Sequence, residues 1–287
     1  MQNFSIYSIF NKFRHILVKN KEDNKLFTLW ISDNCELPQL QQLSLKSMLL
    51  TGHDVTLYVY ENMLNVPEGI KVADANKILD ESKIFKYKEG FNKGSYSGFA
   101  NWFRAKCLYE RGTAWFDCDI IAIKNITEMN VNGPLISSQI NPDFKISPNN
   151  AFLRLNKGDK LLKEMLDYME EVKDNVMHGD TGPNLLKSMI DEKFCKYSDY
   201  LSSTDFIASI NYFDYMDFLK PSKDMVPLLN FEDIWGFHIW NAMFRENGFA
   251  NEKSSNSFYY DLKEAILSSF TKEDYQKKVS DIITTNG

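Results

Sequence analysis

Short apolar runs alternate with helix-length amphipathic segments along the first part of the chain. Residues 26–31 form an apolar run typical of a buried strand, residues 37–51 have helical periodicity and end before Gly52, and residues 54–60 alternate like a second strand. A short third strand is expected at residues 70–73. Because parallel strands need a crossover between them, this order predicts a β-α-β unit in a parallel sheet flanked by helices. Ligands of such sheets bind beyond the carboxyl ends of the strands.

The later pattern adds a strand at residues 135–140, which opens after Gly133-Pro134. Pro183 suits the first turn of a further helix, with Asp180 or Thr181 available as its cap. An amphipathic helical region is expected from Tyr260 to Ile283.

Residues 83–98 are rich in lysine, tyrosine, phenylalanine and glycine, which predicts a mobile loop. This loop either carries substrate contacts above the sheet or is an ordinary exposed connection.

The most informative stretch runs from Ser97 to Ile123, where a helical pattern ends at Gly112 and leads into an apolar run. This run predicts one buried strand that Asp117 and Asp119 interrupt. Burying two unpaired carboxylates costs on the order of several kcal/mol each, so a cation should meet them. Mg²⁺ or Mn²⁺ suits such oxygen ligands, and a bend would let one aspartate bind directly and the other through water. The alternative is a strand end with two solvated aspartates, because D-x-D alone is a weak signal.

Length, composition and charge limit the class of protein, its partners and its expected location. With 287 residues, 44% of them hydrophobic, the chain can bury one large core, and its net charge of −6 gives no electrostatic support for a nucleic-acid partner. The four cysteines lie far apart, which excludes a zinc knuckle or dense disulfide frame and favours reduced cytosolic thiols. No transmembrane run or signal peptide is evident, so the expected location is cytoplasmic.

The expected organisation is an N-terminal amphipathic helix at 1–24, a catalytic domain at 25–250 and a helical C-terminal extension at 251–287. The first helix is basic on one face, so it either contacts an anionic membrane surface peripherally or packs on the domain or a partner. Packing is the commoner fate of such helices and is favoured.

The order of residues around Asp117 resembles that of DXD glycosyltransferases typified by glycosyltransferase family 32 and the glucosylating domains of large clostridial toxins. The family pattern is approximately S-D-x-x-R, L-Y, G-G, Y-x-D-x-D, and the matching residues are Ala100 to Arg104, Leu108-Tyr109, Gly112-Thr113 and Trp115 to Asp119. Two positions depart from it. Asn101 stands where the family has an aspartate that contacts donor-sugar and ribose hydroxyls, and Thr113 stands where it has a second glycine.

The resemblance implies a GT-A fold, with a Rossmann-like, mostly parallel central sheet and helical additions at both ends. It also implies a strand at residues 147–154 that is followed by a helix at 159–172. It implies that Trp30 and Ile31 hold the nucleotide base, although the usual histidine and glycine of that motif are absent. Trp30 as plain core is the alternative, since tryptophans dominate cores. It also places Trp240 at the donor and His238 beside the two aspartates as a third metal ligand. A lone histidine among aromatic residues is otherwise packed or hydrogen-bonded.

Further polar residues are candidates for the sugar. Gln139 and Asn150 are expected to bind its hydroxyls, and Asn149 is a candidate that a turn would explain equally well. Arg104 is expected to add charge stabilisation beside the metal. Asp180, in a segment that resembles the family's T-G-P loop, is a weak candidate for a nucleophile.

The function expected from these residues and the resemblance is a metal-dependent retaining glycosyltransferase. It would use Mn²⁺ or Mg²⁺ and a nucleotide sugar, a UDP-sugar by preference, and act on a glycan or lipid-linked saccharide acceptor in bacterial capsule or surface polysaccharide synthesis. The alternatives are a metal-dependent phosphotransferase or hydrolase, which lacks a P-loop here, and a non-catalytic glycan-binding protein.

Overall fold

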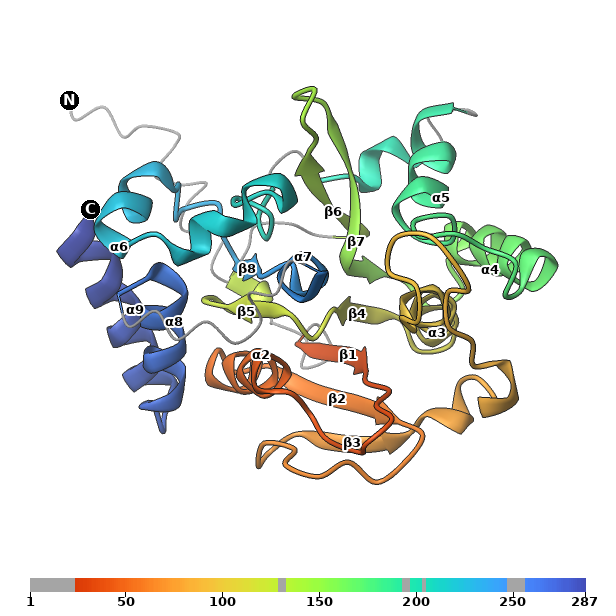
Figure 1. Ribbon diagram of the computed structural model, residues 1–287, viewed down its shortest axis with the longest axis horizontal. Helices are drawn as coiled ribbons and strands as arrows, with labels where there is room; N and C mark the ends of the chain where they lie inside the picture. Colours follow the sequence, from red (N-terminus) through yellow and green to blue (C-terminus); the bar gives the residue numbers. More distant parts are fainter. Residues whose placement is uncertain (1–23, 129–132, 193–196, 203–204, 247–255) are drawn as a thin grey trace, which may run out of the picture.

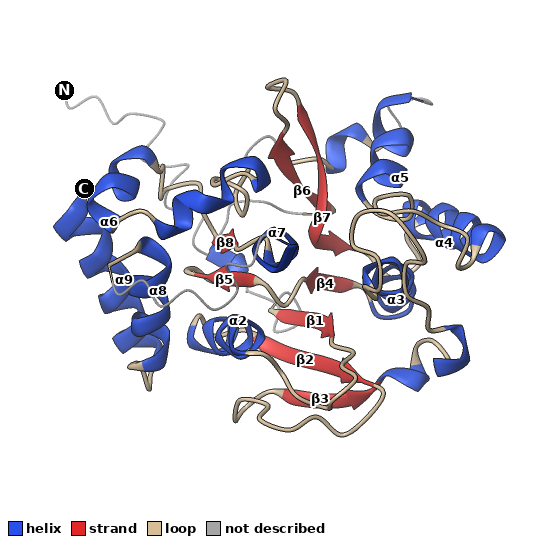
Figure 2. Cartoon of the chain, in the orientation of Figure 1, coloured by secondary structure: helices blue, strands red, loops and turns tan. Residues whose placement is uncertain are grey.

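The computed structural model describes residues 24–128, 133–192, 197–202, 205–246 and 256–287. The helix expected at 1–24 therefore lies outside the described residues. Within them, a six-stranded sheet of order β3-β2-β1-β4-β7-β6 forms the centre (Figures 1 and 2). Strands β3, β2, β1 and β4 are parallel and β7 is antiparallel to both its neighbours, so the sheet is mostly parallel as predicted. Its strands are β1 (Lys25–Leu29), β2 (Asp54–Val59), β3 (Lys71–Asp74), β4 (Thr113–Phe116), β6 (Leu135–Ile140) and β7 (Ile146–Leu155).

The predicted β-α-β unit is present, with helix α2 (Gln39–Leu50) between β1 and β2. Its helix ends before Gly52, whose φ of 85° suits a residue without a side chain. His53 follows, and its buried imidazole contacts the Met48 carbonyl through Nδ1 at 3.1 Å and accepts from the Ile126 amide through Nε2 at 3.0 Å. Burial lowers the pKa of His53 to about 4, so the ring is neutral in the folded protein at neutral pH.

Alternate residues of the strands feed two hydrophobic cores, one on each face of the sheet. In β4, Ala114 and Phe116 join the core on the α2 side, whereas Trp115 joins the core that contains helix α3 (Ser97–Arg111). The second core continues into α4 (Lys160–Val172), which contacts α3. Because both faces are covered, the strand residues are apolar on both sides, which is why β1, β2 and β4 read as continuous apolar runs.

The apolar run around the aspartates is two strands in two sheets, and its interpretation as a single interrupted strand was wrong. β4 ends at Phe116, and β5 (Ile120–Ala122) pairs antiparallel with β8 (Gly236–His238) in a separate two-stranded sheet. Side chains of α2 bond the backbone of β5, since the Ser44 hydroxyl donates to the Ile120 carbonyl at 2.7 Å. These bonds satisfy backbone groups that a place in the main sheet would otherwise pair. Asp117 to Asp119 therefore form the bend between two sheets.

The remaining helices surround this frame. At the C-terminus, α8 (Phe258–Leu267) and α9 (Lys272–Asn286) contact α2 and form the helical addition expected there. Asp159 caps α4 by accepting from the Leu161 amide. The short helices are α5 (Pro183–Lys187), α6 (Ser222–Met225) and α7 (Asn241–Glu246), and none of the helices in the described ranges is long and apolar enough to cross a membrane. Shorter helical turns lie at Ala75–Lys77, Glu81–Lys83, Ile126–Glu128, Ser188–Glu192, Ser198–Tyr200, Tyr212–Leu219 and Val226–Leu228.

Pro183 opens α5 as predicted, but the expected side-chain cap is absent. Gly182 occupies the cap position, and no side chain bonds the helix start there. The candidates point elsewhere: the Asp180 carboxylate accepts from the Met177 amide at 2.8 Å, and the Thr181 hydroxyl accepts from the Asn101 amide group. The prediction of a cap at Asp180 or Thr181 was therefore wrong.

Candidate active site

Residues that follow β1 and β4 line a cavity of about 790 Å³, within the usual range of small-molecule sites. It lies at the carboxyl edge of the parallel strands, where a sheet of this kind binds its ligands. The lining includes all the site residues predicted from the sequence except Asp180, namely Trp30, Ile31, Asn101, Arg104, Asp117, Asp119, Gln139, Asn150, His238 and Trp240.

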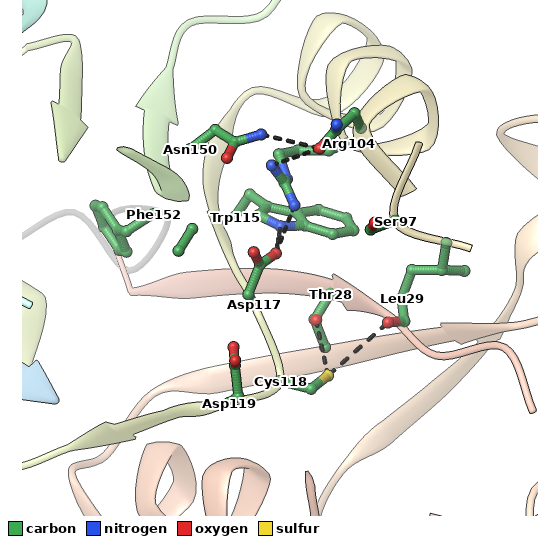
Figure 3. A network of polar contacts seen from close by, with 12 residues as sticks. Thr28, Leu29, Ser97, Arg104, Trp115, Asp117, Cys118, Asp119, Asn150 and Phe152 are labelled. Carbon is green, nitrogen blue, oxygen red and sulfur yellow. Dashed lines mark hydrogen bonds and ion pairs between the residues drawn. The ribbon is translucent and has the colours of Figure 1, made fainter. Parts of the chain in front are cut away.

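Arg104 and Asp117 form a buried ion pair at the base of this cavity. A guanidinium nitrogen (Nη2) of Arg104 lies 2.6 Å from Asp117 Oδ1, and the Trp115 indole donates to the same oxygen at 2.9 Å (Figure 3). Arg104, on α3, is only 5% exposed, while the Asp117 side chain is 29% exposed. Burial raises the pKa of Asp117 above its usual value, although the charge of Arg104 opposes that shift.

Asn101 connects the Arg104–Asp117 ion pair to a wider network of polar side chains. Its Oδ1 accepts from Arg104 Nη1 at 3.1 Å and from Asn150 Nδ2 at 2.9 Å, and its Nδ2 donates to the Thr181 hydroxyl at 3.3 Å. A Cβ atom at Gly182 would lie 2.8 Å from the amide nitrogens of Asn101 and Asn150, so the loop after Thr181 depends on glycine to approach them. Three of the four hydrogen-bonding capacities of the Asn101 amide are thus used by protein groups.

The C-terminal part of the chain returns to the aspartates through β8. His238 Nε2 lies 3.3 Å from Asp119 Oδ2, which also accepts from the Asn241 amide at 3.0 Å. The Ile239 amide donates to the Asp119 carbonyl at 2.8 Å. Burial alone would raise the pKa of Asp119, but the imidazole and the hydrogen bonds outweigh it and lower that pKa. Asp119 and His238, over a hundred residues apart, are therefore direct neighbours.

Comparisons with known proteins were made at the level of sequence and of structure. No family model matches the chain, and no curated protein matches it. Its structure is similar to the apo form of the glycosyltransferase GlyE from Streptococcus pneumoniae TIGR4, at 12% identity and a TM-score of 0.50, over 91% of this chain and 64% of that one. The chain thus spans less than two thirds of that GlyE chain.

The chain has the GT-A fold. Weaker likenesses are to the PaToxG glycosyltransferase, at 13% identity over 92% of this chain and 88% of that one with a TM-score of 0.43, and to the catalytic domain of alpha-toxin from Clostridium novyi. The latter has 11% identity over 96% of this chain and 83% of that one, and a TM-score of 0.34. The predicted fold class is confirmed, while membership of family 32 stays a prediction.

The spacing of Asp119 and His238 would suit two ligands of one divalent ion. Two ligands about 2.1 Å from an ion and at right angles to each other lie about 3 Å apart, close to the observed 3.3 Å between Asp119 Oδ2 and His238 Nε2. Within the described ranges, no set of three His, Cys, Asp or Glu side chains is already gathered as a metal site. The reason is visible in Figure 3, where the Asp117 carboxylate is turned toward Arg104 and Trp115.

Trp30 stands at the end of β1, where its amide continues the strand by donating to the Tyr58 carbonyl at 3.1 Å. The Trp30 side chain is half-buried. It lines the cavity and also packs against the hydrophobic core that includes α2. Its indole Nε1 is buried and has no protein partner in the structure. Between the aspartates, Cys118 turns away from the cavity centre toward the Thr28 hydroxyl and the Leu29 carbonyl (Figure 3). That contact anchors the bend to β1.

The loop at 83–98 lies over this cavity and contributes to its lining, so it is more than an exposed connection. Lys86 pairs with Asp33, just beyond β1, at 2.9 Å. On the other side, Arg245 of α7 donates to the buried Asn92 side chain at 2.6 Å. These two contacts hold the loop at Asp33, beyond β1, and at Arg245, on α7.

Sequence reasoning missed several lining residues, among them Tyr87, His178 and Arg245. Tyr87 and His178 pack edge to face, with ring centroids 5.9 Å apart, and His178 also contacts the Asn92 amide at 3.1 Å. No local sequence pattern marked them as site residues, because Tyr87 lies in a loop, His178 in a turn and Arg245 near the end of the short helix α7. A pairing of the loop with α7 is visible only in three dimensions.

One predicted residue is placed differently from expectation, and another lines the cavity with its indole N–H already bonded. Asp180 does not line the cavity, and its carboxylate closes a local turn on the Met177 amide. Trp240 does line the cavity, but its indole Nε1 donates to the Ile210 carbonyl at 2.7 Å and its ring lies against His238.

Proposed function

We propose that this chain is a metal-dependent glycosyltransferase that transfers a sugar from a nucleotide sugar, a UDP-sugar by preference, with retention of configuration. The observation that carries the proposal is one cavity of the GT-A fold that joins Asp117, Asp119 and His238 to Trp30. GlyE, which shares this fold, is by its name a glycosyltransferase.

Unpartnered donors in the cavity lining support a ligand rich in acceptor oxygens. Buried nitrogen atoms of Trp30 (Nε1), Arg104 (Nε) and Asn149 (Nδ2) have no hydrogen-bond partner within the structure. Leaving each such group unsatisfied costs about 1–3 kcal/mol, so a ligand that supplies phosphate and hydroxyl oxygens would recover that cost. A nucleotide sugar offers such oxygens along its whole length, and its base would lie against Trp30.

Asp119 and His238 would hold the ion directly, with Asp117 reaching it through water or after leaving Arg104. The ion, when bound, would supply a Lewis acid for the departing diphosphate. Arg104 adds a fixed positive charge in a nearly dry position, where its field is little screened. Asn150 and Gln139 lie in the lining, where they can bind sugar hydroxyls.

Retention without a covalent intermediate fits the lining better than a double displacement. A double displacement needs a carboxylate beneath the anomeric carbon, and Asp180, the sequence candidate, is outside the lining. In the alternative, the acceptor hydroxyl attacks from the face that the diphosphate leaves, and a phosphate oxygen takes the hydroxyl proton. The protein then needs to position the two substrates and to stabilise the negative charge on the leaving group.

The acceptor class follows from the sequence resemblance: a glycan or lipid-linked saccharide in bacterial surface polysaccharide synthesis. Peripheral contact of residues 1–24 with the inner face of the membrane would suit a lipid-linked acceptor.

A screen of nucleotide sugars for hydrolysis, with Mn²⁺ and with EDTA, tests the proposed function. We expect release of free sugar and nucleoside diphosphate from at least one donor with Mn²⁺, and loss of this activity in EDTA and in the Asp119→Asn variant. Turnover that persists in EDTA would refute the metal mechanism. Release of nucleoside monophosphate and sugar 1-phosphate in place of free sugar would instead indicate a phosphohydrolase, and absence of turnover with saccharide binding intact would indicate a glycan-binding protein.

A further inference from the structure

The Trp240 side chain is held on its edge and on one face by protein groups. Its Nε1 donates to the Ile210 carbonyl at 2.7 Å, and its ring centroid lies 3.8 Å from that of His238, with the ring planes 34° apart. Tyr212 makes an edge contact at 6.0 Å, and only 9% of Trp240 is exposed. The indole N–H, the group with which a tryptophan hydrogen-bonds a ligand, is therefore already used.

His238 lacks the usual device that orients a metal-binding imidazole. Such a histidine normally donates its second ring nitrogen to a carboxylate, a carbonyl or water, and this bond fixes the plane of the ring. In His238, Nε2 faces Asp119, while Nδ1 is buried and has no partner in the structure. On one face, the imidazole instead lies against the indole of Trp240, with the two ring planes tilted by 34°.

The backbone on both sides of Trp240 is hydrogen-bonded to Asp119, the residue that His238 faces. The amides of Ile239 and Asn241, on either side of Trp240, donate to the Asp119 carbonyl and carboxylate. Trp240 itself has a φ of 55°, in a region that residues with side chains seldom adopt. This backbone turn places the indole of Trp240 against the imidazole of His238, while the amides on either side of Trp240 bond Asp119. The positions of the Trp240, His238 and Asp119 side chains therefore depend on one another.

We propose that Trp240 is a positioning residue that holds His238 in the orientation required for a divalent ion, in place of a contact with the donor. The inference rests on the proposed function, since it assumes an ion at Asp119 and His238. A planar ring that is stacked and anchored at its far edge restricts rotation of the imidazole as a hydrogen bond at Nδ1 would.

The test compares Mn²⁺ dissociation constants, measured by electron paramagnetic resonance of free Mn²⁺ in the absence of donor. Trp240→Leu removes the ring and keeps apolar bulk, whereas Trp240→Phe keeps a ring to stack on His238. Trp102→Leu is the matched control, because Trp102 is similarly buried at 4% exposure but lies outside the cavity lining. UDP affinity at saturating Mn²⁺ and the melting temperature are measured for each variant.

We expect Trp240→Leu to raise the Mn²⁺ dissociation constant by about 10-fold or more, the range seen when a ligand's supporting partner is lost. Trp240→Phe should stay within about threefold of the wild type, and Trp102→Leu should lower the melting temperature without changing Mn²⁺ affinity. His238→Ala sets the scale for complete loss of the ligand.

Two results would overturn the inference while leaving the proposed function intact. One is unchanged Mn²⁺ affinity in Trp240→Leu with weakened UDP binding, which would make Trp240 a donor contact. The other is equal loss of Mn²⁺ affinity in Trp240→Leu and Trp102→Leu, which would reduce the effect to general destabilisation. A wild-type protein that binds no Mn²⁺ even with UDP present would instead refute the proposed metal mechanism, and this inference with it.

Discussion

Replacing Asp117 with alanine should destabilise the fold, in addition to any effect on catalysis, because of the partner that it leaves behind. Arg104 is 5% exposed and loses its 2.6 Å contact with the carboxylate, while it keeps its bond to Asn101 and its contact with the Trp115 ring. Breaking a buried ion pair from one side typically costs about 3–5 kcal/mol, since an uncompensated charge remains buried. Asp117 is 29% exposed, so water can enter the vacated space. We therefore expect a loss of stability at the lower end of that range, about 3 kcal/mol.

Urea unfolding in EDTA, followed by tryptophan fluorescence and far-ultraviolet circular dichroism, measures this loss without metal. The double variant Asp117→Ala with Arg104→Met should recover most of it, because neither charge then remains buried. Asp167→Ala is the control, since it breaks an exposed pair with Lys163 and should cost no more than about 0.5 kcal/mol. The reasoning fails when Asp117→Ala lies within about 1 kcal/mol of the wild type, or when the double variant is less stable than the single one.

Three further predictions concern nucleotide affinity and stability. Trp30→Ala should weaken UDP binding by the ~1–3 kcal/mol typical of base–aromatic stacking, measured by titration calorimetry, and unchanged affinity would leave Trp30 with a packing role alone. Burial holds the pKa of His53 at about 4 in the folded protein, below its ordinary value of 6.5, so the unfolded state takes up the proton first. The free energy of unfolding should therefore fall by about 3 kcal/mol as pH drops from 6.5 to 4, and His53→Gln should flatten this slope; an equal slope in both proteins would contradict the assignment. Thr113 has a φ of 69° and a buried hydroxyl without a hydrogen-bond partner among the described residues, so Thr113→Gly should raise stability by about 1 kcal/mol. A lower urea midpoint in this variant would argue against strain there.

Elements whose signals are local were predicted well from the sequence. The helix before Gly52 and the helix stop at Gly112 each depend on a few consecutive residues. Gly112 has a φ of 71° and lies so close to Lys157 that a Cβ atom would meet its backbone nitrogen at 2.8 Å. Thr113, the next residue, also has a positive φ, which explains why glycine suits both positions of the family motif.

Features that depend on distant partners could not be predicted in the same way. The apolar residues of β5 have the composition of a continuation of β4, and only the hydroxyls of α2 and the return of β8 separate them. His238 shows the same limit, because a histidine between tryptophans has one local pattern whether it is packed in a core or faces a carboxylate. The resemblance placed His238 near the aspartates, and the structure puts its Nε2 at 3.3 Å from Asp119 Oδ2. Its role as a ligand stays a prediction.

The two aspartates, two residues apart in sequence, have different partners, and this difference decides which of them is available to a cation. Asp117 Oδ1 already accepts two hydrogen bonds, one from the guanidinium of Arg104, so a metal that binds this oxygen must displace a positive charge at 2.6 Å. Asp119 accepts from a backbone amide and faces the imidazole of His238, which brings a lone pair to an ion when it is neutral. A cation therefore gains a second ligand at Asp119 and meets electrostatic competition at Asp117. Asp119 and His238 should accordingly contribute more to Mn²⁺ affinity than Asp117, whose bond to Arg104 would instead hold the guanidinium in place for a bound diphosphate.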